Sequence, residues 1–200
     1  MFRALYLVGL IVGSTVRGIC TRRYRPSAAA DERRSGLDSA LRRVASVGLL
    51  VLPLVYVLTP WLDFADYGLP MWTGGVGGVV FAAAVWLLWR FHVDLGRNWS
   101  STLQVNVEHT LVTQGVYRQV RHPMYAAHWL WAVAQLLLLH NWIAGPALLV
   151  LFLPLYILRV RREEQMMLDH FGEEYRAYIK RTGRVLPLSI SKYWGKSLLS

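Results

Sequence analysis

Five apolar runs divide the chain, at about residues 2–19, 44–62, 71–91, 123–140 and 146–160. A helix needs roughly 20 mostly apolar residues to cross a bilayer. The fifth run reaches that length by extending into the charged residues that follow it. The pattern predicts an all-α integral membrane protein, a single domain over residues 1–200 with five transmembrane helices. We expect residues 21–43 and 92–122 to be polar connections.

Basic residues gather at one side of the predicted spans. Of the 22 Lys and Arg residues, all except Arg3 would lie at one membrane face. They are found near the ends of the first, third and fifth runs and in the polar stretches that follow these runs. Such stretches stay in the cytoplasm. We therefore predict an extracytoplasmic N-terminus and a cytoplasmic C-terminus. Three tryptophans fall near the predicted outer ends, as an aromatic belt would: Trp61, Trp72 and Trp142.

Charge and cysteine content narrow the classes of partner. A formal charge of +10 would suggest nucleic acid in a soluble protein. Between apolar runs, the anionic headgroups of membrane lipids are the expected partner, and we predict no binding of nucleic acid. Cys20 is the single cysteine, so the sequence contains neither an internal disulfide nor a zinc site built on cysteines. The sequence indicates no oligomeric state.

Small residues predict close packing in the third run. Gly74 and Gly78 form a GxxxG pattern, which lets neighbouring helices approach closely. We interpret this pattern as helix packing and not as a ligand site.

Two polar stretches carry the candidate chemistry, at residues 109–125 and 159–164. The short turn at residues 141–145 makes the fourth and fifth runs an antiparallel hairpin. The first stretch ends where one arm begins, and the second lies where the other arm ends. Both stretches should therefore be neighbours on the cytoplasmic face.

The spacing of the charged residues leaves their role open. Arg159 and Glu163 are four residues apart and share a face of a helix, whereas Glu164 points about 100° away from Glu163. A surface ion pair on a solvated helix explains this spacing at least as well as a binding site does.

Other kinds of site lack their motifs. His109 and His122 do not have the spacing of a zinc motif, so we predict no metal. Ser100 and Ser101 lack the elbow that activates a serine nucleophile. The sequence contains neither GxGxxG nor a P-loop, which argues against a soluble type of dinucleotide or ATP site.

Read together, the motifs resemble a known family. They are Gly115-x-Tyr117-x-x-x-Arg121-His122-Pro123-x-Tyr125, Glu163-Glu164, Phe171-Gly-Glu-Glu-Tyr175-x-x-Tyr178 and Pro187. This set resembles the integral-membrane isoprenylcysteine carboxyl methyltransferases and the related phospholipid methyltransferases. The resemblance covers about residues 96–188, and residues 109–112 are similar to the isoprenylcysteine branch in particular.

The resemblance implies a membrane methyltransferase that uses S-adenosyl-L-methionine in a cytoplasmic, helical C-terminal region. Its implied reaction is methyl esterification of the carboxylate of a prenylcysteine-like lipidated substrate. Arg159 would be the catalytic and substrate-binding residue. The implied cofactor-binding residues are Gln104, His109, Thr110, Leu111, Val112, Tyr117, His122, Pro123, Met124, Tyr125 and Glu163.

Elementary chemistry favours this reaction and keeps alternatives open. A guanidinium fork suits a carboxylate, and a carboxylate is ionised at neutral pH without a base. The same Arg159 could hold a lipid phosphate, so N- or O-methylation of a phospholipid or other small lipid is an alternative. Outside the enzymes, the alternative is a membrane scaffold or transporter subunit. Residues 171–178 predict an amphipathic helix that acts as a lid over the cofactor or as a membrane-surface anchor.

Overall fold

The computed structural model describes residues 2–23, 36–96 and 110–188. Within these ranges the chain forms helices and connecting loops, with two isolated bridge pairs and no strand. The prediction of an all-α chain is therefore confirmed for the described residues. The main helices are α1 (Phe2–Arg23), α2 (Gly36–Ser46), α3 (Leu52–Leu58), α4 (Met71–Leu95), α5 (Pro123–Leu138) and α6 (Ala147–Arg181), with a π-helical segment η2 (Val47–Val51) and short 3-10 turns η3 (Asp63–Ala65) and η5 (Gly115–Arg118).

The predicted boundaries of the second run were wrong at both ends. Helix α2 begins at Gly36, inside the stretch predicted as a polar connection, and α3 ends at Leu58 rather than at residue 62. Pro60 disfavours helical geometry at the residue before it, and Thr59 is extended, with φ −135° and ψ 157°. The early start has a different cause: α2 is amphipathic and packs against α6.

Three helical units have the length and composition to cross a membrane, among the residues that the structure describes. They are α1, the continuous unit Gly36–Leu58 and α4. Helix α5 has 16 residues, about 24 Å, which is shorter than a bilayer core of about 30 Å. Helix α6 carries many charges in its second half. Crossing by these two helices, and with it the five-span topology, stays a prediction.

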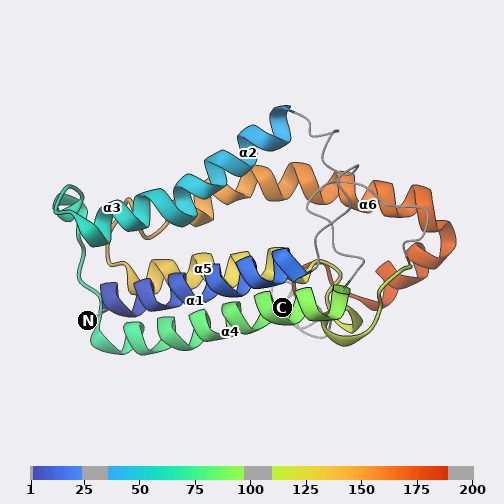
Figure 1. The fold of residues 1–200 in the computed structure, drawn as a ribbon, viewed down its shortest axis with the longest axis horizontal. Helices are drawn as coiled ribbons and strands as arrows, with labels where there is room; N and C mark the ends of the chain where they lie inside the picture. Colours follow the sequence, from blue (N-terminus) through green and yellow to red (C-terminus); the bar gives the residue numbers. More distant parts are fainter. Residues whose placement is uncertain (1, 24–35, 97–109, 189–200) are drawn as a thin grey trace, which may run out of the picture.

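The helices form two layers (Figure 1). Helices α1, α4 and α5 lie side by side in one layer, and α2, α3 and α6 lie in the other. The turn between α5 and α6 is closed by Asn141, whose side-chain oxygen accepts hydrogen bonds from the N–H groups of Ile143 (3.0 Å) and Ala144 (2.9 Å). The predicted hairpin of α5 and α6 is thus confirmed, with its two arms in different layers.

Glycines let α4 approach its neighbours closely, as predicted. A Cβ atom added at Gly74 would lie 2.0 Å from the ring of Phe2 in α1. One added at Gly77 would lie 3.0 Å from the side chain of Leu138 in α5. The small residues of α4 therefore face two helices of its layer.

The end of the bundle that contains α1's first residue also contains the tryptophans of the predicted belt. Trp61, Trp72 and Trp142 are all strongly exposed. Arg3 forms ion pairs with Asp63 (2.8 Å) and Asp66 (3.1 Å). The basic residue that departs from the charge bias is therefore neutralised within the chain.

Gln135 organises a polar network inside the bundle and is fully buried. Its Nε2 donates to the carbonyl oxygens of Gly48 (3.1 Å) and Ala144 (2.6 Å), and its Oε1 accepts a hydrogen bond from the hydroxyl of Tyr6 (2.9 Å). Gly48 belongs to η2, and π-helical turns of this kind mark departures from regular helical hydrogen bonding. Gln135 thereby joins α5 to the other layer.

We predict that Gln135→Leu destabilises the protein. The substitution removes the amide that donates to two carbonyl groups and one of the partners of the Tyr6 hydroxyl, which costs about 1–3 kcal/mol of unfolding free energy. Thermal unfolding in detergent measures the change. Val133→Leu, at an exposed position of the same helix, is the matched control and should have little effect. Equal stability of the two variants would contradict the role of Gln135.

Candidate functional site

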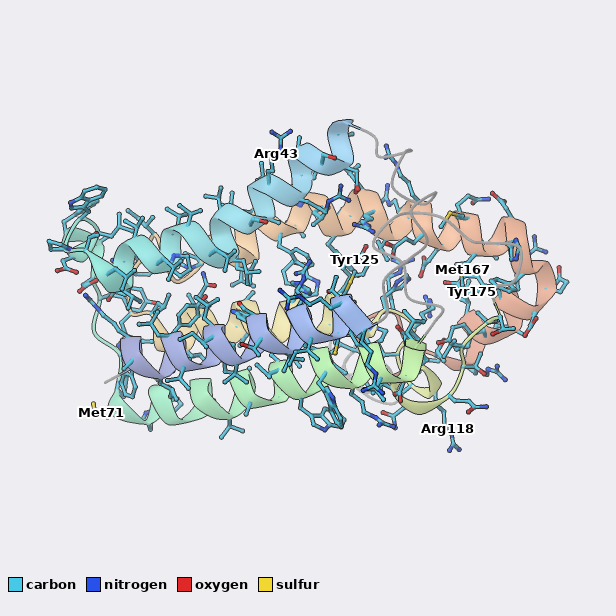
Figure 2. The ribbon with its side chains drawn as sticks, in the orientation of Figure 1. Arg43, Met71, Arg118, Tyr125, Met167 and Tyr175 are labelled. Atoms are coloured by element: carbon cyan, nitrogen blue, oxygen red, sulfur yellow. The ribbon has the colours of Figure 1, made fainter. Side chains whose placement is uncertain are left out.

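The two predicted polar stretches meet where α5 begins and α6 leaves the bundle. The hydroxyl of Tyr125 donates to Oε1 of Glu163 at 2.9 Å, and Nε of Arg159 donates to the same oxygen at 2.9 Å. Figure 2 shows Tyr125 in the space between the two layers. The predicted proximity of the hairpin ends, and the shared helix face of Arg159 and Glu163, are both confirmed.

His122 lies between the two adjacent glutamates. It precedes Pro123, which occupies the first turn of α5, where its missing N–H costs nothing. Nδ1 of His122 is 3.5 Å from Oε2 of Glu163, and Nε2 is 3.3 Å from Oε1 of Glu164. The two glutamates leave α6 in different directions. Both nevertheless contact His122 in the turn before α5, since each ring nitrogen of the histidine faces one of them.

The charges of this cluster support one another. Burial disfavours the protonated imidazole, but the hydrogen bonds and charges of the two glutamates outweigh burial and raise the pKa of His122. Burial likewise works against the charged glutamates, but hydrogen bonds and charges from His122 and the neighbouring side chains together outweigh it and lower the pKa of Glu163 and of Glu164. The cluster therefore favours the imidazolium form of His122, held between two carboxylates.

Glu164 also ties the C-terminal part of the chain to the turn before α5. Its Oε1 accepts hydrogen bonds from Nε of Arg121 (2.9 Å) and Nε of Arg184 (3.0 Å). Next to these side chains, the N–H of Arg121 donates to the carbonyl of Gly183, and the N–H of His122 donates to that of Arg184, both at 2.9 Å. A carboxylate with two guanidinium partners and an imidazole thus fixes this junction.

A break in α6 makes the junction possible. Gly172 has φ +51° and ψ −122°, a conformation that suits glycine alone. The chain reverses direction there (Figure 1), and we call residues 173–188 the return segment. The hydroxyl of Tyr178 in this segment donates to the carbonyl of Tyr117 at 2.6 Å. Residues 171–178 therefore pack against the site's loop, although whether they cover a cofactor stays a prediction.

The loop before the site is held by Asp94 at the end of α4. Its carboxylate accepts the N–H of Val116 at 2.8 Å and pairs with Arg90 at 3.0 Å. Gly115 has φ +59°, and a Cβ atom there would lie 2.1 Å from the Asp94 carboxylate. Glycine is thus required at this position twice, by its backbone angle and by the carboxylate beside it.

The structure brings together some of the residues predicted to bind a cofactor. His122, Pro123, Tyr125 and Glu163 meet as described above. Tyr117 is buried nearby, and Met124 and Val112 pack against the apolar core. Thr110 is exposed and Leu111 half-buried in the extended approach to η5. Gln104 and His109 lie outside the described residues.

Sequence reasoning missed four residues that the structure adds: Asp38, Asp94, Arg121 as a partner of Glu164, and Arg184. Asp38, from α2, lies 3.8 Å from Nη1 of Arg159. It forms an i,i+4 pair with Arg42, so the spacing gave a signal that was lost when these residues were predicted as a loop. Asp94 likewise forms an i,i+4 pair with Arg90. For the contact of Arg184 with Glu164, the sequence offers no local signal.

An apolar groove of about 590 Å³ opens on the flank of α5. Helix α4, η5 and the return segment form its other walls. Trp129 lines the groove, and its ring also lies 5.5 Å from that of Tyr156, which lies 5.5 Å from the ring of Tyr125. Two aromatic side chains thus connect the groove with the polar cluster.

Comparison with known proteins bears out the resemblance. The model of the Isoprenylcysteine carboxyl methyltransferase (ICMT) family matches residues 76–169, which include Tyr125, Arg159 and Glu163. Protein-S-isoprenylcysteine O-methyltransferase A of Arabidopsis thaliana is 26% identical over 140 residues, which cover 69% of this chain and 71% of that protein. The human Protein-S-isoprenylcysteine O-methyltransferase is 38% identical over 79 residues, which cover 40% of this chain and 28% of the human protein.

A solved structure has a similar fold. It is that of the eukaryotic intramembrane Ras methyltransferase ICMT, with a TM-score of 0.57 and 22% identity, covering 86% of this chain and 60% of that one. The chain spans about half the length or less of several curated relatives, such as 51% of the Oryza sativa protein and 35% of the Schizosaccharomyces pombe one. The predicted resemblance to this family is confirmed, and the fold is of the same kind.

We predict that His122 makes stability depend on pH above 6.5, its ordinary pKa. Because its folded pKa is raised above the ordinary value of 6.5, its stabilising contribution is complete below pH 6.5 and is lost as pH rises through the folded pKa. The melting temperature of the wild type should therefore fall over that window relative to the melting temperature of His122→Asn. The lowered pKa values of the glutamates act separately, below about pH 4.5. Parallel pH profiles of the two proteins would contradict the imidazolium between the carboxylates.

Proposed function

We propose that this chain is a membrane methyltransferase that transfers the methyl group of S-adenosylmethionine to the carboxylate of a prenylcysteine-like lipidated acceptor. The observation that carries the proposal is the Arg159–Glu163 pair, which is joined to His122 and Tyr125 where α5 and α6 meet. The matched relatives, which are named protein-S-isoprenylcysteine O-methyltransferases, support the same reaction.

The polar cluster suits the cofactor's charges. S-adenosylmethionine supplies an electrophilic methyl group on a sulfonium and carries an ammonium and a carboxylate. Glu163, ionised and oriented by Tyr125 and Arg159, fits the ammonium through charge-assisted hydrogen bonds. The positive charge of His122 suits the cofactor's carboxylate. We propose that residues 109–112 also lie around the cofactor.

Arg159 suits the acceptor. A guanidinium offers a carboxylate two parallel donors in a fixed plane, so it can hold the nucleophilic oxygen toward the methyl group. The acceptor carboxylate is already ionised at neutral pH, and no general base is needed. The chain's task is then to position the two reactants and to withdraw them partly from water.

The membrane setting suits a lipophilic acceptor. The apolar groove beside α5 offers a hydrocarbon chain a place within the helical layer, and Trp129 links it to Tyr125. We propose that the site faces the cytoplasm, that α5 and α6 complete five spans, and that the basic residues of this face contact anionic lipid headgroups. The cofactor would then enter from water and the acceptor from the bilayer.

Binding of S-adenosylhomocysteine tests the cofactor site. We expect the wild type to bind it in isothermal titration, and Glu163→Gln to weaken binding about tenfold or more, because a charged hydrogen bond is worth about 1.5–3 kcal/mol. Glu164→Gln, which removes a charge from the junction of Arg121 and Arg184, should weaken binding less. No binding by the wild type would exclude the enzyme and leave a membrane scaffold or transporter subunit. Equal losses in the two variants would mean that Glu163 has no special role.

Arg159→Lys tests the acceptor site. Lysine keeps the charge but loses the planar fork, so we expect kcat/KM for a prenylcysteine acceptor to fall about 100-fold, as for a misplaced reactant. The affinity for S-adenosylhomocysteine should change little. Arg162→Lys, at an exposed position on the same helix, is the matched control. A collapse of cofactor affinity in Arg159→Lys would show that Arg159 does not serve the acceptor specifically.

A further inference from the structure

Asp38 is a buried carboxylate that the reaction outlined above does not use. It lies in the first turn of α2, is 8% exposed, and forms a close ion pair with Arg42 one turn further on. Its Oδ1 lies 3.8 Å from Nη1 of Arg159. Helix α2 lies outside residues 76–169, the range that the family match covers. The N-terminal half of the chain thus contributes an acidic group to the proposed acceptor side.

The geometry makes Asp38 a shared counterion. At 3.8 Å, its contact with Arg159 is an ion pair but is longer than a hydrogen bond, and Arg42 is the closer partner. Glu163 meets Arg159 on the other side, at Nε. Arg159 is 8% exposed, and a guanidinium buried to this degree is costly without compensating negative charge. Two internal carboxylates provide that charge in this structure.

Ligands would exchange these partners one at a time. If the cofactor's ammonium engages Glu163, part of the negative charge at Arg159 is withdrawn, and Asp38 is a carboxylate that remains beside it within the described part of the chain. An acceptor carboxylate that then approaches Arg159 carries the same charge as Asp38 and competes with it. Arg42 offers Asp38 a second cation to which it can turn.

We propose that Asp38 holds the place of the acceptor carboxylate. It is a positioning and specificity residue: it neutralises Arg159 while the cofactor is bound, and it yields to the acceptor by pairing with Arg42 alone. This inference rests on the proposed function, because it requires a cofactor with an ammonium and an acceptor with a carboxylate.

Opposite shifts in two affinities test the inference. In full-length Asp38→Asn, cofactor binding leaves Arg159 with less compensating charge, so we expect the Kd for S-adenosylhomocysteine to rise about threefold to tenfold. The acceptor has lost a competitor, so KM for a farnesylcysteine analogue should fall by a similar factor, with little change in kcat. A purely structural role would weaken both. Loss of both affinities, or no change in either, overturns the inference.

A reciprocal variant keeps the test decisive if Asp38→Asn does not fold. Arg42→Gln removes the alternative partner and leaves Asp38 to Arg159, so KM for the acceptor should rise about threefold to tenfold without a rise in the Kd for S-adenosylhomocysteine. An unchanged or lowered KM overturns the inference. Asp169→Asn is the matched control, because Asp169 is an exposed carboxylate of α6 that accepts a hydrogen bond from Gln165. If the wild type neither binds S-adenosylhomocysteine nor turns over, the proposed function itself fails, which is a different result.

Discussion

The structure depends on a series of ion pairs, with alternating positive and negative side chains, that crosses the molecule at one end of the bundle. Each buried charge in it would be costly alone, and each charge has at least one neighbour of opposite sign. This series of ion pairs connects α2, α6, the turn before α5 and the return segment, so it positions four parts of the chain. In order, its members are Arg42, Asp38, Arg159, Glu163, His122, Glu164 and the two arginines Arg121 and Arg184.

This arrangement needs a scaffold that holds the two layers at a fixed separation. Gln135 provides one tie, by joining α5 to η2 and to the turn that precedes α6. The hairpin turn at Asn141 provides another. Both ties are built from hydrogen bonds between a side-chain amide and backbone groups, which tolerate little movement. The hydrogen bond from Tyr125 to Glu163 can therefore span the layers at the opposite end, where we propose that ligands exchange partners with the ion pairs.

Local patterns predicted much of the fold and half of the candidate site. A short turn between two apolar runs fixed the hairpin, and helical spacing paired Arg159 with Glu163. Contacts between distant segments had no such signal. Arg184 reaches Glu164 because Gly172 reverses the chain, and a glycine within a helical pattern does not disclose the direction that follows. The apolar run predicted a helix only from residue 44, whereas α2 begins at Gly36. The spacing of Asp38 and Arg42 therefore fell in a predicted loop, where it indicates no ion pair. Whether α5 and α6 cross the membrane depends on the bilayer, which spacing alone does not define.

The most direct measurement follows the methyl group itself. Purified protein in liposomes that contain phosphatidylethanolamine is supplied with S-adenosylmethionine labelled in the methyl group and with a farnesylcysteine analogue. The account predicts label in the analogue that mild base releases as methanol, because a carboxyl methyl ester is labile to base. Base-stable label in phosphatidylethanolamine, with none in the analogue, would contradict a carboxylate acceptor at Arg159.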